Sequence, residues 1–173
     1  MNPVRRTLIL AALAATALTA CGQTETATKL DPIEIGRGTS CSLDGMLLGD
    51  YPGPKAQIHY AGQAEPDFFC DTVEMFHTHL NPEQVRGVLG MFVQDMGKAD
   101  WDEPKDHWID AKQAFYVHGS KRRGSMGPTI ASFAQESDAQ KFAAEHGGKV
   151  YRFADITPDM VVLDGGAIHD SNM

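Results

Sequence analysis

The chain has 173 residues, of which 42% are hydrophobic and 22% charged, and its formal net charge is −8 at pH 7. Without the leader described below, its length suits one domain with a real hydrophobic core. The acidic balance argues against a phosphate-binding surface, which needs clustered Lys and Arg, so we expect no nucleic-acid partner.

The first 21 residues have the parts of an exported lipoprotein's leader. Arg5 and Arg6 give a basic start, an apolar run covers 8–18, and the stretch Leu-Thr-Ala-Cys over 18–21 is a lipobox, whose Cys21 thiol takes the lipid. The apolar run is shorter than the roughly 20 residues that a membrane-spanning helix needs. We predict that residues 1–20 are a signal peptide and that Cys21 is the lipid attachment site.

The segment after Cys21 has the composition of a tether. Residues 22–31 are small and polar and show no apolar periodicity. We therefore expect residues 21–31 to be a flexible linker and residues 32–173 to form the folded domain. No second apolar run follows, so we expect the lipid anchor to be the only attachment to the membrane. We also expect the chain to be a monomer.

The first half of the domain has the element order strand, strand, helix, strand. Short strands are predicted over 56–60 and 67–70. Asp71 and Glu74 are spaced as in a capping box, which predicts the start of a helix. The apolar run over 88–93 then predicts a buried strand.

The second half repeats this order. It contains predicted strands over 108–117 and 129–133, a helix starting at a second capping box over 137–140 and stopped by Gly147-Gly148, and a closing strand over 149–153. The sequence thus predicts an α+β fold of two tandem ββαβ units, at about 40–98 and 99–156, with small and mainly antiparallel sheets.

Sulfur-bearing residues are the best candidates for chemistry. Cys41 and Met46 stand five positions apart, with Gly45 allowing a turn beside the methionine, and Met126 lies in a loop that has no periodic reason to carry a large apolar residue. Thiolate and thioether together favour Cu(I), because soft ligands suit a soft monovalent ion. The alternative is that both methionines fill gaps in the core.

Cys41 and Cys70 are the cysteines left once Cys21 carries lipid. In an oxidising compartment such a pair usually forms a disulfide, which would make the chain a structural lipoprotein or a thiol–disulfide protein. The pair does not have the Cys-x-x-Cys spacing of redox motifs. Cys70 can also be a small hydrophobe at the end of a buried strand.

Eight short segments in a fixed order carry a family resemblance. They are CSLDGM at 41–46, YPGPKA at 51–56, FCD at 69–71, VQDMGK at 93–98, WIDA at 108–111, FYV at 115–117, MG at 126–127 and FAAEHGG at 142–148. Together with the lipobox they resemble NosL, the family of lipoprotein copper chaperones that accompany nitrous oxide reductase. The resemblance extends to about residue 156 and implies the same fold of two ββαβ units.

The resemblance also implies binding of one Cu(I) ion. The family's cysteine-to-methionine motif falls on Cys41 and Met46 and its later Met-Gly motif on Met126, so these three are the predicted copper ligands. Many relatives have a second cysteine where this chain has Asp44. The candidates for a fourth ligand are Cys70, His59, His118 and His169.

The implied role is that of a chaperone, not an enzyme. The sequence lacks Gly-x-Ser-x-Gly and His-Glu-x-x-His, in line with this expectation. The implied partners are nitrous oxide reductase, its membrane assembly complex of the ABC-transporter type, or both, on the periplasmic side of the membrane in denitrifying bacteria. Gly22 after Cys21 is not a retention acid, which favours the outer over the inner membrane.

Overall fold

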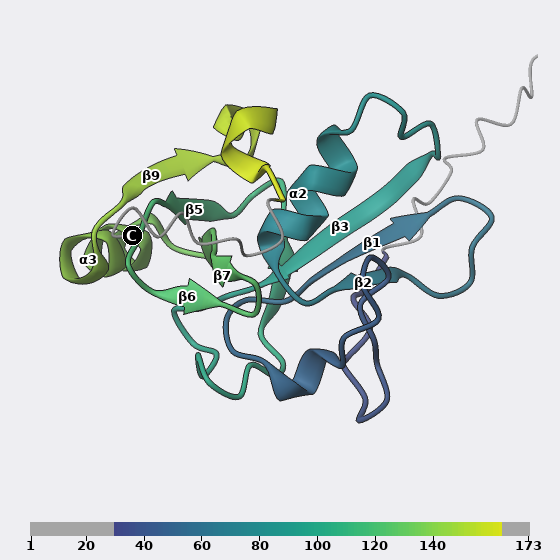
Figure 1. Cartoon of the computed structure of the whole chain (residues 1–173), viewed down its shortest axis with the longest axis horizontal. Coiled ribbons are helices and arrows are strands. Elements are labelled where there is room, and N and C mark those ends of the chain that lie inside the picture. Colours follow the sequence, from purple (N-terminus) through teal and green to yellow (C-terminus); the bar gives the residue numbers. More distant parts are fainter. Residues whose placement is uncertain (1–29, 164–173) are drawn as a thin grey trace, which may run out of the picture.

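The computed structural model describes residues 30–163. The predicted signal peptide, lipid attachment site Cys21 and candidate ligand His169 lie outside these residues. In Figure 1, two small sheets lie side by side, with helix α2 (Thr72–Leu80) on the first and helix α3 (Glu136–His146) at the outer end of the second. The described part has no helix that is long and apolar enough to cross a bilayer.

The first unit contains strands β1 (Ala56–Tyr60), β2 (Asp67–Phe69) and β3 (Val88–Gln94), with α2 between β2 and β3. β1 lies between β2 and β3 and pairs antiparallel with both. All five residues of β1 are buried, as expected for a central strand. The predicted order strand, strand, helix, strand is confirmed here.

The second unit contains β5 (Phe115–His118), β8 (Ala131–Phe133), α3 and β9 (Lys149–Arg152). Its strand order, β8-β5-β9, is the counterpart of β2-β1-β3, and both of its pairings are antiparallel. The two units therefore share one topology, which confirms the predicted α+β class.

The single strand predicted over 108–117 is wrong. β4 (Trp108–Asp110) pairs with β3 in the first sheet, whereas β5 belongs to the second. Between them, the Asp110 carboxylate accepts a hydrogen bond from the backbone N–H of Lys112 at 2.7 Å and forms a turn. This turn has neither Gly nor Pro, and the chain uses it to pass from one sheet to the other.

The two predicted capping boxes have different outcomes. At α2, Asp71 accepts from the N–H of Val73 and Glu74 accepts from the N–H of Asp71, which confirms the prediction. The second box is wrong, because α3 begins at Glu136 after Gln135 and has no side-chain cap. The predicted stop is confirmed at Gly147, whose φ of 78° few other residues adopt.

One hydrophobic core joins the two units. The rings of Phe76 from α2 and Tyr116 from β5 meet edge to face with centroids 5.0 Å apart. Phe153, at the start of the short helix η2 (Phe153–Asp155), packs on Phe76 at 5.2 Å, and η3 (Pro158–Val161) packs along α2. The units are therefore held as one body.

The connection between β5 and β8 contains a small hairpin, β6 (Arg123–Gly124) and β7 (Gly127–Pro128). In Figure 1 this hairpin lies between the second sheet and the start of α2. Gly124 permits this position, because a Cβ there would lie 2.2 Å from Asp71 Oδ2. The hairpin turn brings Ser125 and Met126 from the second unit toward the first.

Candidate metal centre

Two buried cysteines form the centre of the site. Cys41 lies in a loop closed by a bridge between Ser40 and Leu47, in which the N–H of Cys41 donates to the Met46 carbonyl at 2.8 Å. Gly45 makes the turn of this loop with a φ of 80°. Cys70 follows β2, and the exposed fractions of Cys41 and Cys70 are 3% and 0%. Both are free thiols in the structure.

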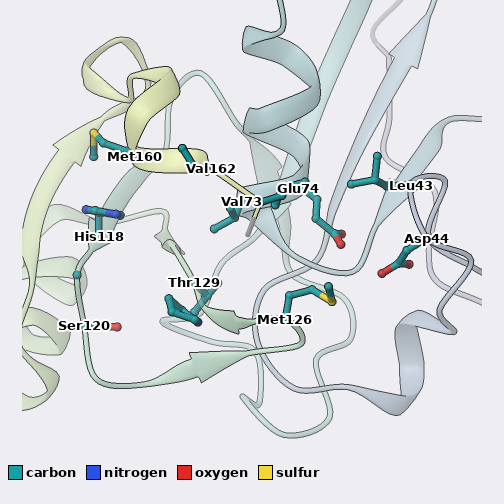
Figure 2. Close-up of a pocket in the computed structure, with 13 residues that line it drawn as sticks. Leu43, Asp44, Val73, Glu74, His118, Ser120, Met126, Thr129, Met160 and Val162 are labelled. Carbon is teal, nitrogen blue, oxygen red and sulfur yellow. The ribbon is translucent and has the colours of Figure 1, made fainter. Parts of the chain in front are cut away.

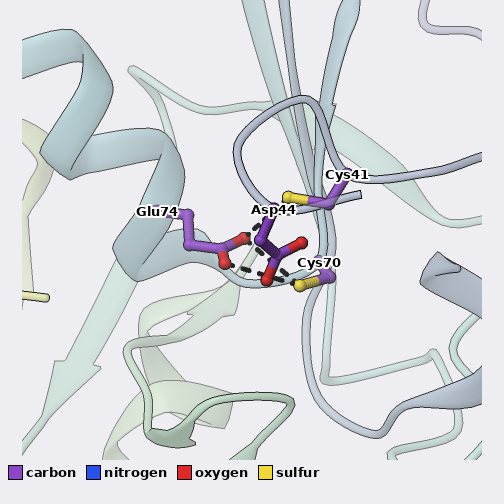
Figure 3. Close-up of side chains that lie close together, drawn as sticks. All are labelled: Cys41, Asp44, Cys70 and Glu74. Atoms are coloured by element: carbon purple, nitrogen blue, oxygen red, sulfur yellow. Dashed lines mark hydrogen bonds between the residues drawn. The ribbon is translucent and has the colours of Figure 1, made fainter. Parts of the chain in front are cut away.

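A carboxylate joins the two thiols. The Sγ atoms of Cys41 and Cys70 each lie 3.3 Å from Glu74 Oε2 and donate to it (Figure 3). Glu74 is the residue that completes the capping box of α2, and it is 1% exposed. The rigid first turn of the helix thus holds the carboxylate against both sulfur atoms.

Asp44 completes a four-residue cluster. One ligand atom each from Cys41, Asp44, Cys70 and Glu74 lies within 4.8 Å of all the others. Asp44 is exposed, and its Oδ1 accepts a hydrogen bond from the N–H of Met46 at 3.0 Å. Asp44 therefore adds a carboxylate oxygen to the cluster of two thiols and Glu74.

The two predicted methionine ligands lie beside this cluster. Met46 and Met126 are partly buried and both pack against the small core formed by Cys41, Leu48 and Cys70. Figure 2 shows the Met126 thioether on the same side of the pocket as the carboxylates of Asp44 and Glu74. The structure thus brings the three predicted ligands and Cys70 to one place, from three separate segments of the chain.

The buried groups shift one another's pKa. A hydrogen bond from the Cys70 thiol lowers the pKa of Cys41 to about 6 despite burial, and backbone N–H groups add to this effect. The same bond holds the Cys70 proton and raises the pKa of that thiol. Burial first, and then the charge of Cys41, raise the pKa of Glu74 to about 7. Cys41 is therefore the first thiol to become a thiolate, the form that binds soft metal ions.

A buried cation lies behind the site. Lys55 precedes β1, is 0% exposed, and donates from Nζ to the carbonyls of Pro52 and Cys70, both at 3.0 Å. Burial lowers its pKa to about 8 against the attraction of Asp71 and Cys70. Asp71 is fully buried as well, which raises its pKa to about 7, and its Oδ2 has no hydrogen-bond partner among residues 30–163.

A pocket leads from the cluster toward the second unit. It is lined at one end by Asp44, Glu74 and Met126 and at the other by His118 and Met160 (Figure 2). It gives solvent a path to Met126 and to the carboxylates of Asp44 and Glu74.

The histidine candidates differ in position. His118 is part of the pocket wall, whereas His59 lies within the first sheet, where its Nε2 is 2.9 Å from Gln57 Oε1 and its ring packs edge-on against Phe92. His59 is not among the residues that line the pocket.

Sequence reasoning missed the carboxylates of Asp44 and Glu74, which lie beside the two thiols. It explained Asp71 and Glu74 by helix capping alone, although the buried Glu74 also accepts from both thiols. One signal was available: in a capping box the Glu74 carboxylate bonds back to the backbone N–H of Asp71, the residue directly after Cys70, which brings it beside the cysteine. For Asp44 the signal was its position in the cysteine-to-methionine motif.

Comparisons with known proteins agree on one family. The family model described as NosL matches residues 32–161, most of the chain. The chain belongs to the NosL family. This confirms the resemblance inferred from the eight sequence segments.

Two curated relatives cover nearly the whole chain. Both are named copper-binding lipoprotein NosL. The protein from Stutzerimonas stutzeri is 38% identical over 94% of this chain and 87% of its own length, and the one from Achromobacter cycloclastes is 39% identical over 91% and 83%.

A solved structure supports the fold. The crystal structure of the copper chaperone NosL from Shewanella denitrificans superposes with a TM-score of 0.72 at 38% identity, and covers 75% of this chain and 97% of its own. The arrangement of the two ββαβ units is thus that of the NosL fold.

Proposed function

We propose that this protein is an exported, lipid-anchored metallochaperone that binds one Cu(I) ion and passes it on. The observation that carries the proposal is the meeting of two buried free thiols with Met46 and Met126 packed against them. Relatives named for copper binding and a solved copper chaperone support it. Soft sulfur ligands in a sheltered site suit Cu(I) and protect it from stray redox chemistry.

The ligands in this proposal are Cys41, Met46 and Met126, with Cys70 as the fourth. Among the candidates for that fourth place we favour Cys70, because its Sγ shares a carboxylate oxygen with Cys41. Glu74 then accepts hydrogen bonds from the thiols before copper arrives and stays beside the site afterwards.

The proposed action is transfer, not enzymatic turnover. The ligands come from loops and segment ends, and the pocket beside Glu74 and Met126 leaves the site open on one side. An incoming donor from an acceptor protein can therefore replace one sulfur ligand at a time through a shared, mixed-ligand state.

The acceptor in this proposal is nitrous oxide reductase or its ABC-transporter-type assembly complex. Removal of residues 1–20 takes Arg5 and Arg6 and no acidic residue, so the formal charge of the mature chain is 13 − 23 = −10. This charge would steer it toward a basic patch on such a partner, and added salt would slow the encounter. The test is transfer from the Cu(I)-loaded chaperone to the copper-free reductase, with and without the assembly complex. Copper that stays on the chaperone in both mixtures would refute this assignment.

The proposed location is the periplasmic face of a membrane, reached through lipid on Cys21. Relatives named as lipoproteins support the anchor, and Gly22 after Cys21 favours the outer membrane. Separation of the two membranes tests this choice. Mature protein found with the inner membrane would contradict it, and the Cys21→Ala variant serves as the unanchored control.

The first experiment is a Cu(I) titration of the reduced chain, residues 22–173, against a chromophoric chelator. We expect one ion per chain, and weaker binding in Cys41→Ala, Met46→Leu and Met126→Leu. Met96→Leu is the matched control, because Met96 packs in the other core cluster, with Trp101 and Phe133. A parent chain that binds no Cu(I) would refute the proposal.

The second candidate is a structural or thiol–disulfide lipoprotein with a Cys41–Cys70 disulfide. The closeness of the two sulfur ligand atoms, within 4.8 Å, favours it. Thiol counting on the protein isolated from the periplasm decides between the two. Two free thiols that Cu(I) protects from alkylation support the copper site, whereas no thiol before reduction and no copper binding after it would support the disulfide.

A further inference from the structure

We propose that Ser125 is the positioning residue that holds Met126 at the copper site, by a hydrogen bond to the backbone of Cys70. This inference rests on the proposed function, because it assigns a role in the same site. Ser125 is not a ligand in this scheme. Its hydroxyl also lies within hydrogen-bond reach of the Cys70 thiol, but the role proposed for it acts through the methionine next to it.

The hydrogen bond links the two units of the fold. Ser125 Oγ donates to the Cys70 carbonyl oxygen at 2.7 Å, across 55 positions of sequence. Ser125 lies in the turn between β6 and β7, and Cys70 follows β2. One bond therefore joins the segment that carries the thioether to the segment that carries the thiol.

The Cys70 end of this bond is rigid. The same carbonyl accepts from Lys55 Nζ at 3.0 Å, and the next residue, Asp71, caps α2. Cys70 is fully buried, so its backbone cannot shift without disturbing the core. The hairpin turn is the adjustable partner, and the Ser125 hydroxyl sets its place.

The rest of the hairpin makes few other polar contacts with this region. Beyond the turn, Thr129 Oγ1 donates to Asp71 Oδ1 at 2.8 Å, which holds the base of the hairpin. At its tip, Ser125 and Met126 are both only partly buried. Met126 packs against the cluster of Cys41, Leu48 and Cys70 but is only partly buried. We therefore infer that loss of the Ser125 bond lets Met126 shift out of place while the base of the hairpin stays fixed.

The test is a double-mutant cycle on Cu(I) affinity with the variants Ser125→Ala and Met126→Leu. A net hydrogen bond corresponds to roughly a three- to tenfold change, so we expect Ser125→Ala to weaken Cu(I) binding by about that factor. In the Met126→Leu background, we expect Ser125→Ala to have a much smaller effect, because the group that it positions is gone and only its contact with the Cys70 thiol remains.

Two readouts separate positioning from general loss of structure. X-ray absorption of the Cu(I)-loaded chain should show one sulfur neighbour fewer in Ser125→Ala than in the parent. Ser125→Thr, which keeps the hydroxyl, should restore both the affinity and that neighbour. Ser137→Ala is the matched control, since Ser137 is exposed on α3 and far along the chain from the site.

The outcomes distinguish this inference from the proposed function. If Met126→Leu weakens binding but Ser125→Ala leaves it unchanged, or if the two effects simply add, the positioning role is overturned and the ligand set stands. If neither change weakens binding of Cu(I) by a chain that does bind it, Met126 is not a ligand and both assignments fail.

Discussion

The two ββαβ units have the same topology but carry different residue types at corresponding positions. Their registers place Ala56 opposite Phe69 in the first and Phe115 opposite Phe133 in the second. By this correspondence Lys55, Cys70 and Asp71 occupy the places of Ala114, Ala134 and Gln135. A buried cation, a thiol and a buried carboxyl in one unit thus correspond to two small apolar residues and an exposed amide in the other.

The connections between strands differ as well. In the first unit β1 and β2 are joined by the short loop 61–66, whereas in the second β5 and β8 are separated by residues 119–130, which form the β6–β7 hairpin. The first unit carries the two buried thiols, and the hairpin of the second brings Met126, the proposed thioether ligand, against them. The same topology therefore positions the thiols in the first unit and, in the second, carries the hairpin that covers them.

Cys70→Ser should have the largest effect, because it removes one of the two thiols that distinguish the cluster from the second unit, where the counterpart is Ala134. A hydroxyl keeps the hydrogen bond to Glu74 but is a poor ligand for Cu(I). Changes outside the ligand set of metal sites cost about 10- to 100-fold, so a lost ligand should weaken Cu(I) binding by more than about 100-fold. Competition with a chelator measures it. The counterpart change, Ala134→Ser, should leave the affinity unchanged.

Lys55→Met should destabilise the apoprotein by about 3 kcal/mol. The change leaves the carbonyls of Pro52 and Cys70 without a donor and the buried Asp71 without a nearby cation. Urea unfolding measures the free energy. Lys112→Met, at an exposed turn, should change it by less than about 0.5 kcal/mol. Equal effects of the two changes would contradict a special role for Lys55.

Asp71 should make the stability of the apoprotein fall as pH rises. Its pKa in the folded state is about 7, above its ordinary value of 3.8, so the folded state binds the proton more tightly than the unfolded state between these values. The stabilisation is complete below about pH 4 and is lost as the pH rises through 7, by roughly 2–4 kcal/mol.

Denaturant unfolding from pH 4.5 to pH 8 measures this slope. In Asp71→Asn the amide does not titrate, like the neutral Gln135 of the second unit. The free energy of unfolding should therefore fall less between pH 4.5 and pH 8 than in the parent, by roughly 2–4 kcal/mol. A slope that persists unchanged in Asp71→Asn would assign it to Glu74, whose pKa is also raised to about 7.

Gln135→Asp should have the smallest effect, and unlike the changes above it should stabilise the protein. α3 has no side-chain cap, and a carboxylate at Gln135 can accept from the first free N–H groups of the helix. We expect a gain of about 1 kcal/mol in the free energy of unfolding, measured by urea. Gln135→Ala offers no acceptor and should give no gain. A gain in both variants would show that capping is not the cause.

Local signals predicted most of the fold. Five of the six predicted strands and both helices occur near their expected positions, because each has its own apolar run or capping pattern. The errors lie where a local pattern is ambiguous. The run 108–117 reads as one strand because its turn uses Asp110, without Gly or Pro. The box at 137–140 has the right spacing, but the helix starts one position before it, at Glu136.

The candidate site was predicted in part, and for a physical reason. Cys41, Met46 and Met126 were singled out by spacing, loop position and family resemblance. Glu74 was explained by capping, because a capping carboxylate and a thiol acceptor look alike in a sequence. Lys55 has no sequence signal, since a lysine before a strand is usually exposed.

The sequence by itself predicted the exported leader, the order of elements and the cysteine-to-methionine motif, because each is written in neighbouring residues. Only the tertiary structure decided that Cys41 and Cys70 share the Glu74 carboxylate, that Lys55 lies buried behind them, and that the hairpin brings Met126 to them. These contacts join segments tens of residues apart. Their closeness depends on how the two units pack around one core, which no local pattern records.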